Sequence, residues 1–162
     1  MKKKAIIISI KGSKLSRQEK ILLSKEKPWG VILFKRNIKS ISQTQKLVKN
    51  IKQLSKDRKF PILIDEEGLQ VSRLTNIFNH DLSANFFGSL YKKDKIVSIT
   101  LYKTYLRVLN DILRKIGINI NTVPVLDVLR KNTHSIIGRR SFSENKDIVK
   151  KFGEITIKEC FR

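Results

Sequence analysis

The sequence has few of the residues that build disulfides and metal centres. Its 162 residues include one cysteine, Cys160, and two histidines, His80 and His134, which lie far apart. A single cysteine excludes a disulfide within the chain, and no Cys/His cluster has the spacing of a zinc site. We therefore predict no metal and no cofactor, and a reducing cytoplasmic setting.

Long apolar runs are also absent. The most apolar stretch near the start, residues 5–10, is too short for a secretory leader and is followed at once by Lys11. No run approaches the length that crosses a bilayer. We therefore expect no membrane partner, and we interpret residues 5–10 as a first, buried strand.

Acidic residues are scarce relative to basic ones. The chain carries 35 Lys and Arg against 14 Asp and Glu, a formal net charge of +21. Such an excess is typical of proteins that bind nucleic acid or an anionic surface. However, the lysines are spread along the chain, and aromatic residues are not interleaved with them as base stacking requires. A basic nucleic-acid-binding α/β domain is therefore the alternative hypothesis, with nucleic acid an unlikely partner.

What the sequence does contain is an alternation of strand and helix patterns. Capping-box patterns at Ser16–Glu19 and Ser40–Gln43 predict the starts of two helices, the second extending to about residue 55. The alternation predicts βαβ units around a parallel sheet. A doubly wound sheet and a partial barrel fit this pattern equally well. The predicted strands are residues 5–10, 31–34, 62–64 and 118–123.

Two further helices are predicted after the third strand. Residues 74–91 have no clear period and are interpreted as a loop, before a long helix over 94–116 that ends at Gly117. The pattern Ser141–Glu144 predicts the cap of a last helix. The inner positions expected are Ile96, Val97, Leu101, Tyr105, Val108, Leu109, Ile112, Leu113 and Ile116 on the first helix, and Ile148, Val149, Phe152, Ile155 and Ile157 on the second.

The strongest local signal is the end of the third predicted strand. The apolar run 62–64 stops at Asp65, Glu66 and Glu67, and Gly68 follows. Arg73 lies within one short loop of these acids. Parallel α/β folds place their functional groups at the carboxyl ends of strands. A candidate site at Asp65 and Arg73 and a merely solvated acidic turn are the two interpretations.

A family resemblance separates these alternatives. The stretch Asp65-Glu-Glu-Gly-Leu-Gln-Val-Ser-Arg73 resembles the Asp-Gln-Glu-Gly-Gly-x-Val-x-Arg signature of family 3 glycoside hydrolases, in particular bacterial β-N-acetylhexosaminidases. The segments Gly30-Val-Ile-Leu-Phe-Lys-Arg-Asn37, Pro124-Val-Leu-Asp-Val128 and Ile137-Gly-Arg-Arg-Ser-Phe142 agree in the same order. The resemblance covers nearly the whole chain from about residue 5.

The resemblance implies an α/β fold, a partial (β/α)8 TIM barrel with about the first four strands and their helices. A complete barrel takes about 250 residues, so residues 1–162 correspond to the N-terminal half of the family's barrel domain. The implied activity is release of terminal N-acetylglucosamine from cell-wall fragments during peptidoglycan recycling. The implied partners are an N-acetylglucosamine-containing saccharide and either a C-terminal half-chain or a second copy.

The resemblance also assigns roles to residues. It places Asp65, Arg73 and Arg140 at the family's substrate-binding positions, where charged groups make the stronger hydrogen bonds to sugar hydroxyls. The alternative for the arginines is a salt-bridge network that braces loops. For Asp127, in Pro-Val-Leu-Asp-Val, we favour a role bracing its loop.

No catalytic residue is assigned. The family's Asp nucleophile and the His of its Lys-His-Phe-Pro-Gly-His-Gly loop have no counterpart within residues 1–162. Glu66 and Glu67 are adjacent, so in extended chain they would point to opposite faces and make a poor catalytic pair. Leu69 replaces the signature's second glycine, and Arg139 stands where the family usually has an acid. A non-catalytic sugar-binding remnant is therefore a third hypothesis.

Overall fold

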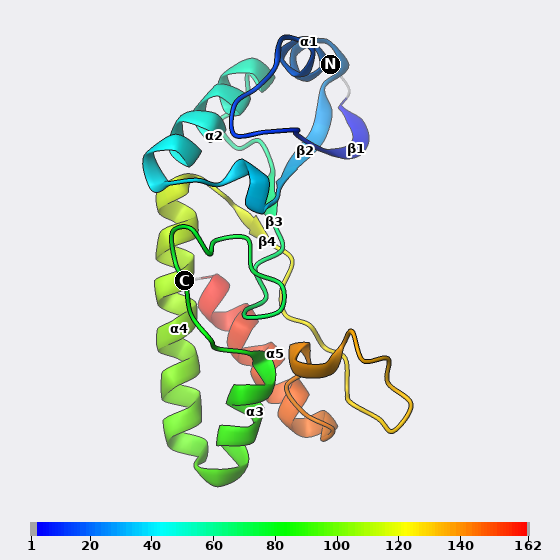
Figure 1. Ribbon diagram of the computed structural model, residues 1–162, viewed down its shortest axis with the longest axis vertical. Coiled ribbons are helices and arrows are strands. Elements are labelled where there is room, and N and C mark those ends of the chain that lie inside the picture. Colours follow the sequence, from blue (N-terminus) through cyan, green and yellow to red (C-terminus); the bar gives the residue numbers. More distant parts are fainter. Residues whose placement is uncertain (1–2, 162) are drawn as a thin grey trace. The chain divides into compact units, whose positions relative to one another are not determined.

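The computed structural model describes residues 3–161, as helices and strands in alternation (Figure 1). The strands are β1 (Lys4–Ser9), β2 (Pro28–Leu33), β3 (Ile62–Ile64) and β4 (Ile120–Asn121). The helices are α1 (Arg17–Glu26), α2 (Ile41–Ser55), α3 (Ala84–Lys93), α4 (Lys95–Ile116) and α5 (Lys146–Cys160). Two 3₁₀ turns, η1 (Lys35–Asn37) and η2 (Gly138–Arg140), complete the elements.

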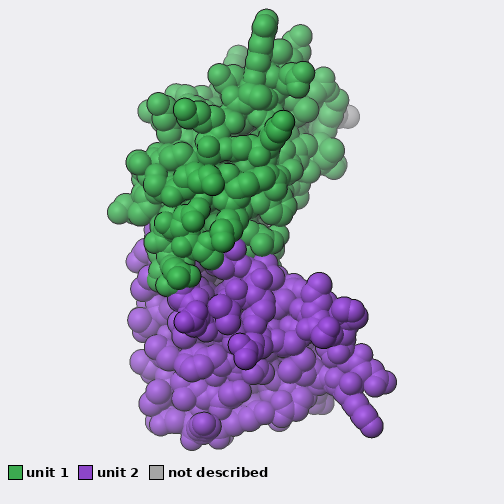
Figure 2. All heavy atoms as spheres, viewed as in Figure 1, with its two compact units in different colours: residues 1–65, 73–79, 112–122 green, residues 66–72, 80–111, 123–162 purple. Residues whose placement is uncertain are grey.

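The chain forms two compact units, coloured separately in Figure 2. Unit 1 comprises residues 1–65, 73–79 and 112–122 and contains the sheet with α1 and α2. Unit 2 comprises residues 66–72, 80–111 and 123–162 and contains α3, α5 and most of α4. Each unit has its own core.

The sheet of unit 1 is parallel and has the strand order β1-β2-β3-β4. Each strand pairs with its neighbour in the chain, with Ile8 opposite Val31 and Ile32 opposite Leu63. A doubly wound sheet would reverse its order at a switch point, whereas a (β/α)8 barrel adds strands in sequence. The observed order therefore confirms the predicted partial barrel.

The prediction that residues 5–10 form a buried strand is wrong about burial. The strand exists, but Ile6 and Ile7 are 51% and 45% exposed. The physical reason is that β1 is an edge strand, and among the described residues it pairs with β2 alone. Only Ile10, just beyond the strand, is buried. β4 is also shorter than the predicted 118–123.

The core of unit 1 lies between the sheet and its two helices. Ser16 caps helix α1, and the predicted capping box with Glu19 is present. Ser40 caps helix α2 as predicted, but the Gln43 side chain accepts from the Lys39 N–H at 2.8 Å rather than from the Ser40 N–H. The buried apolar side chains include Leu23, Val31, Leu33, Ile38, Leu47, Ile51, Phe60, Ile62, Ile64 and Leu74.

The interpretation of residues 74–91 as a loop is wrong in its second half, where α3 begins at Ala84. The Ser83 hydroxyl accepts from the Phe86 N–H at 3.1 Å and caps this helix. An aromatic cluster then holds α3, α4 and α5 together within unit 2. It consists of Phe87, Tyr91, Tyr102, Tyr105, Phe142 and Phe152.

This cluster also sets which side of α4 is buried. Tyr102, Tyr105 and Leu109 are buried as part of the inner stripe, and the Tyr102 hydroxyl lies 2.7 Å from the Thr156 hydroxyl of α5. Part of the predicted inner side is wrong: Ile96, Val97, Leu101, Val108 and Ile157 are exposed. The apolar pattern was broader than the face that the aromatic rings cover.

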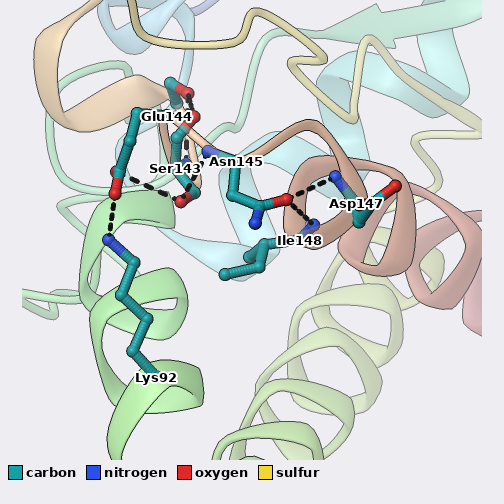
Figure 3. A network of polar contacts seen from close by, with 7 residues as sticks. Lys92, Ser143, Glu144, Asn145, Asp147 and Ile148 are labelled. Atoms are coloured by element: carbon teal, nitrogen blue, oxygen red, sulfur yellow. Dashed lines mark hydrogen bonds and ion pairs between the residues drawn. The ribbon is translucent and has the colours of Figure 1, made fainter.

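Helix α5 begins at Lys146 and is capped by Asn145, four residues after Ser141, so the predicted cap at Ser141–Glu144 is wrong. Figure 3 shows the Asn145 side chain accepting from the backbone N–H groups of Asp147 and Ile148, at 2.8 and 3.4 Å. Glu144 instead pairs with Lys92 of α3 at 2.6 Å. No helix within residues 3–161 is both long and apolar enough to cross a bilayer.

Candidate functional site

The carboxyl ends of the four strands of unit 1 gather polar and aromatic groups. Phe34 and η1 follow β2, Asp65 follows β3 directly, and Thr122 follows β4. Arg36 of η1 donates through Nε to the carbonyl of Ile10, which follows β1, at 3.1 Å. Because the strands are parallel and in sequential order, these four ends lie along one edge of the sheet.

Asp65 is the central carboxylate of this edge. Its Oδ1 accepts from the Thr122 hydroxyl at 2.7 Å, and its Oδ2 lies 3.7 Å from Nη2 of Arg73. Both side chains of the ion pair remain about a quarter exposed, 27% for Asp65 and 26% for Arg73. The pair is therefore positioned by the fold and still reachable by a ligand.

An aromatic ring supports the cationic part of the edge. The guanidinium carbons of Arg36 and Arg73 lie 4.7 and 5.6 Å from the centre of the Phe34 ring. Such cation–π contacts hold a planar guanidinium in one orientation. The ring therefore limits the positions of both guanidinium groups, of which that of Arg73 pairs with Asp65.

Asn37, for which the sequence predicts no role, holds two strand ends together. It is fully buried, and its amide donates to the carbonyls of Ile10 and Gly12 at 3.0 and 2.8 Å. Its Oδ1 accepts from the Phe34 N–H at 2.8 Å. A buried amide with all these bonds made is structural, and it fixes the chain beside Phe34.

The segment after Asp65, residues 66–72, belongs to unit 2, and its Glu67 pairs with the third predicted residue, Arg140. Arg140 of η2 donates to both carboxylate oxygens of Glu67, Nε at 2.6 Å and Nη2 at 2.9 Å. This bidentate, partly buried pair is among the stronger side-chain interactions. Arg140 thus braces the 66–72 loop of unit 2, which is the alternative role considered for it.

The two departures from the family signature have clear structural outcomes. Gly68 has φ +129°, and a side chain there would meet the Leu82 carbonyl oxygen at 2.9 Å. The next residue, Leu69, is not in the left-handed region, and its N–H donates to the same oxygen at 3.0 Å. Leu69 therefore adds no backbone strain. Arg139 is exposed, whereas Arg140 is held by Glu67.

Asp127 does not brace its loop through its carboxylate, which is exposed. The loop is held instead by the backbone: the Asp127 carbonyl accepts from the Ser141 hydroxyl, and the Leu129 N–H donates to the Ser143 carbonyl at 3.1 Å. The expected bracing exists, but Ser141 supplies the side chain.

A buried carboxylate, Glu66, acts on Tyr105 in unit 2. Glu66 is 1% exposed. Burial, then the charge of Glu66, then Tyr102 raise the pKa of Tyr105. Burial lowers the pKa of His80, which Asp81 only partly opposes. The His80 ring packs edge-on against Tyr105 and accepts the Leu82 N–H through Nδ1 at 3.1 Å. The raised pKa keeps Tyr105 protonated, and the lowered pKa favours the neutral form of His80.

The edge of unit 1 can bind a polar ligand, but its chemistry is one of recognition. Asp65 offers carboxylate oxygens and Arg73 a fork of donors, which suit neighbouring sugar hydroxyls. Residues 3–161 contain no group of three or more His, Cys, Asp or Glu side chains arranged to hold a metal. The family's nucleophile and acid/base loop have no counterpart in the sequence.

Sequence reasoning singled out Asp65 and Arg73, which the structure pairs, but it missed their supports. The structure adds Phe34, Arg36 and Thr122 to the edge of unit 1, and Glu67 as the partner of Arg140. One signal was available: Phe34 and Arg36 follow β2 as Asp65 follows β3. Thr122 gave none, since a single threonine after a short strand is commonplace.

A sequential parallel sheet with charged groups at its carboxyl edge defines the class: part of a (β/α)8-barrel protein. The family model described as glycosyl hydrolase family 3 N terminal domain matches residues 2–160. The chain belongs to this family, as the sequence motifs predict.

Individual relatives agree. The chain is 31% identical over 147 residues to the β-hexosaminidase of Xanthomonas axonopodis pv. citri, covering 91% of this chain and 43% of that protein. Among solved structures, NagZ from Neisseria gonorrhoeae in complex with N-trifluoroacetyl-D-glucosamine matches with TM-score 0.87 and 29% identity, over 98% of this chain and 46% of that one.

A family 3 β-N-acetylglucosaminidase from Paenibacillus sp. str. FPU-7 matches with TM-score 0.85 and 25% identity, over 96% of this chain and 29% of that one. The chain therefore spans less than half the length of the relatives named here.

Proposed function

We propose that this chain supplies the substrate-binding half of a family 3 β-N-acetylhexosaminidase and holds a terminal N-acetylglucosamine of cell-wall saccharides. The observation that carries the proposal is the Asp65–Arg73 pair at the carboxyl ends of the strands, 3.7 Å apart and partly exposed. The names of the relatives support the sugar class. The resemblance also gives Arg140 a substrate-binding position, and this role stays a prediction, because the Arg140 side chain pairs with Glu67 within unit 2.

The catalytic step requires groups from outside these residues. A retaining glycosidase needs a nucleophile and an acid/base group close together, and the family motifs for both are absent from residues 1–162. In the proposed role, the chain binds and orients the sugar, and a C-terminal half of the barrel performs the chemistry. A cytoplasmic setting and peptidoglycan recycling belong to the same proposal; the single cysteine is compatible with that setting.

The proposal is tested with N-trifluoroacetyl-D-glucosamine, whose fluorine signal broadens when the sugar binds. We expect fluorine NMR to detect binding to the wild-type chain and Asp65→Asn to weaken it about tenfold or more, because charged hydrogen bonds to the sugar are lost. Asp57→Asn is the matched control: it makes the same change in unit 1, at a residue bonded to Lys3.

Three outcomes decide the matter. Equal binding by wild type and Asp65→Asn would mean that Asp65 only braces Thr122 and Arg73. No binding by the wild type would reject the sugar-binding role. A chromogenic N-acetylglucosaminide run beside the NMR should give no turnover; turnover abolished by Asp65→Asn would show that this chain holds its own catalytic acids.

A further inference from the structure

A strongly charged hollow of unit 1 lies at the other end of the sheet from Asp65. Its residues come from the last turns of α2 and α4 and the segments after them, which lead into the amino ends of β3 and β4. The hollow has a volume of about 750 Å³, within the roughly 300–1,000 Å³ of small-molecule sites. We call it the basic groove.

Five cations line the basic groove: Lys49, Lys52, Lys56, Arg58 and Lys115. One acid, Asp57, lies among them, and it is held by Lys3 at 2.6 Å and by the Lys59 N–H at 2.8 Å. The groove itself therefore carries a marked positive excess.

The negative carbonyl ends of the helices do not neutralise these cations. Two helices end here, and each carbonyl end is equivalent to about half a negative charge. Lys52 donates to the Gly117 carbonyl at 2.9 Å and offsets part of it. About one negative charge from two helices is far below the five cations around it. Most of the positive charge is left to attract an anion from solution.

The base of the groove is apolar. Val48 and Ile116 line it and are almost fully buried, 3% and 1% exposed. The methylene chains of lysines beside them add apolar surface. Gly117 has φ +84°, and a side chain there would meet Val48 at 2.9 Å. The glycine therefore lets the chain after α4 pack closely against Val48.

A cationic rim over an apolar base fits a ligand with both features. We propose that the basic groove binds a compact organic polyphosphate, of the nucleoside di- or triphosphate class, with the phosphates among the lysine ammonium groups and the ring against the apolar lining. This site is separate from the proposed sugar site, because it lies before the strands rather than after them. Barrels place catalysis at the other, carboxyl end, so the role would be regulatory binding.

The test is calorimetry at physiological salt with four probes: ATP, inorganic tripolyphosphate, adenosine and a short DNA duplex. We expect ATP to bind more tightly than tripolyphosphate, which lacks the ring, and adenosine not to bind. Lys49→Gln with Lys115→Gln should weaken ATP binding about tenfold or more. Both side chains are exposed, so the fold should survive.

The matched control is Lys25→Gln with Lys39→Gln, which removes the same charge from unit 1 outside the groove. Equal ATP affinities in the two double variants would show that only net charge matters and would overturn the proposal. Equal affinity for ATP and tripolyphosphate would overturn the role of the apolar base. Tighter binding of the duplex, lost in the groove variant, would assign the groove to nucleic acid instead.

Discussion

At the scale of single residues, the best-defined carboxylate outside the site is Glu19 of α1. Its side chain accepts from the backbone N–H groups of Lys11 and Ser16, both at 2.7 Å. Burial opposes ionisation, but these two hydrogen bonds more than offset it, and the pKa of Glu19 lies below its ordinary value near 4.5. The ionised side chain therefore stabilises the folded state.

The sign of the pH dependence follows from the lowered pKa. The contribution of Glu19 is present above about pH 4.5 and is lost as the pH falls through the lower folded-state pKa. We expect Glu19→Gln to cost about 1 kcal/mol at pH 7, a typical value for a lost helix cap. The difference from wild type should shrink below about pH 4.5, measured by urea unfolding. Glu154→Gln, an exposed acid on α5, is the control; a pH-independent difference would contradict the assignment.

Individual residues also show how much of the candidate site could be predicted from the sequence. Asp65 and Arg73 were found because an apolar strand ends abruptly at an acid and a motif supports both. Thr122 could not be found, since its contact with Asp65 joins residues 57 positions apart. Glu67, the bidentate partner of Arg140, could not be predicted either, because nothing in the sequence distinguishes which of three consecutive acids pairs with an arginine.

At the scale of elements, the sequence predicted helices with local signals and missed those without them. Ser16 and Ser40 predict the starts of α1 and α2, and the structure shows both serines as the capping residues. Ser83 was overlooked because the aromatic residues after it follow no clear helical period. Asn145 was missed because Ser141 fitted the capping-box pattern, but the Ser141 hydroxyl bonds to the Asp127 carbonyl instead.

Helix α3 packs closely against the segment before α5, and this contact leads to a prediction about stability. Gly88 of α3 lies so close to Phe142 that a methyl group there would overlap the Phe142 carbonyl oxygen. We expect Gly88→Ala to destabilise the protein by about 3 kcal/mol, at the upper end for overpacking, because backbone must move. Thermal unfolding measures it. Gly12→Ala, where nothing lies within 4 Å, should change stability little; equal effects would refute the packing argument.

At the scale of the whole molecule, the exposed edge of β1 matters most. Ile6 and Ile7 are about half exposed, and β1 pairs on one side only among the described residues. An unpaired, apolar edge is a template for pairing with another chain. In the absence of a C-terminal half, we expect the purified chain to self-associate through β1.

Light scattering after size-exclusion chromatography tests this expectation. Ile6→Lys with Ile7→Lys should shift the chain toward monomer, because charges on an edge strand oppose pairing. Ile96→Lys, at a side chain of α4 that is 79% exposed, should leave association unchanged. A wild-type monomer, or equal shifts with both changes, would remove β1 as the interface.

The sequential order of the sheet has a consequence for how the protein is made. Because β1 pairs with β2 and β2 with β3, each strand finds its partner already synthesised when it leaves the ribosome. The last pairing, of Ile64 with Asn121, must wait while α3 and α4 emerge. Folding can thus proceed from the amino end in step with translation. Its slow step should be the long-range closure onto β4, since non-local contacts form last.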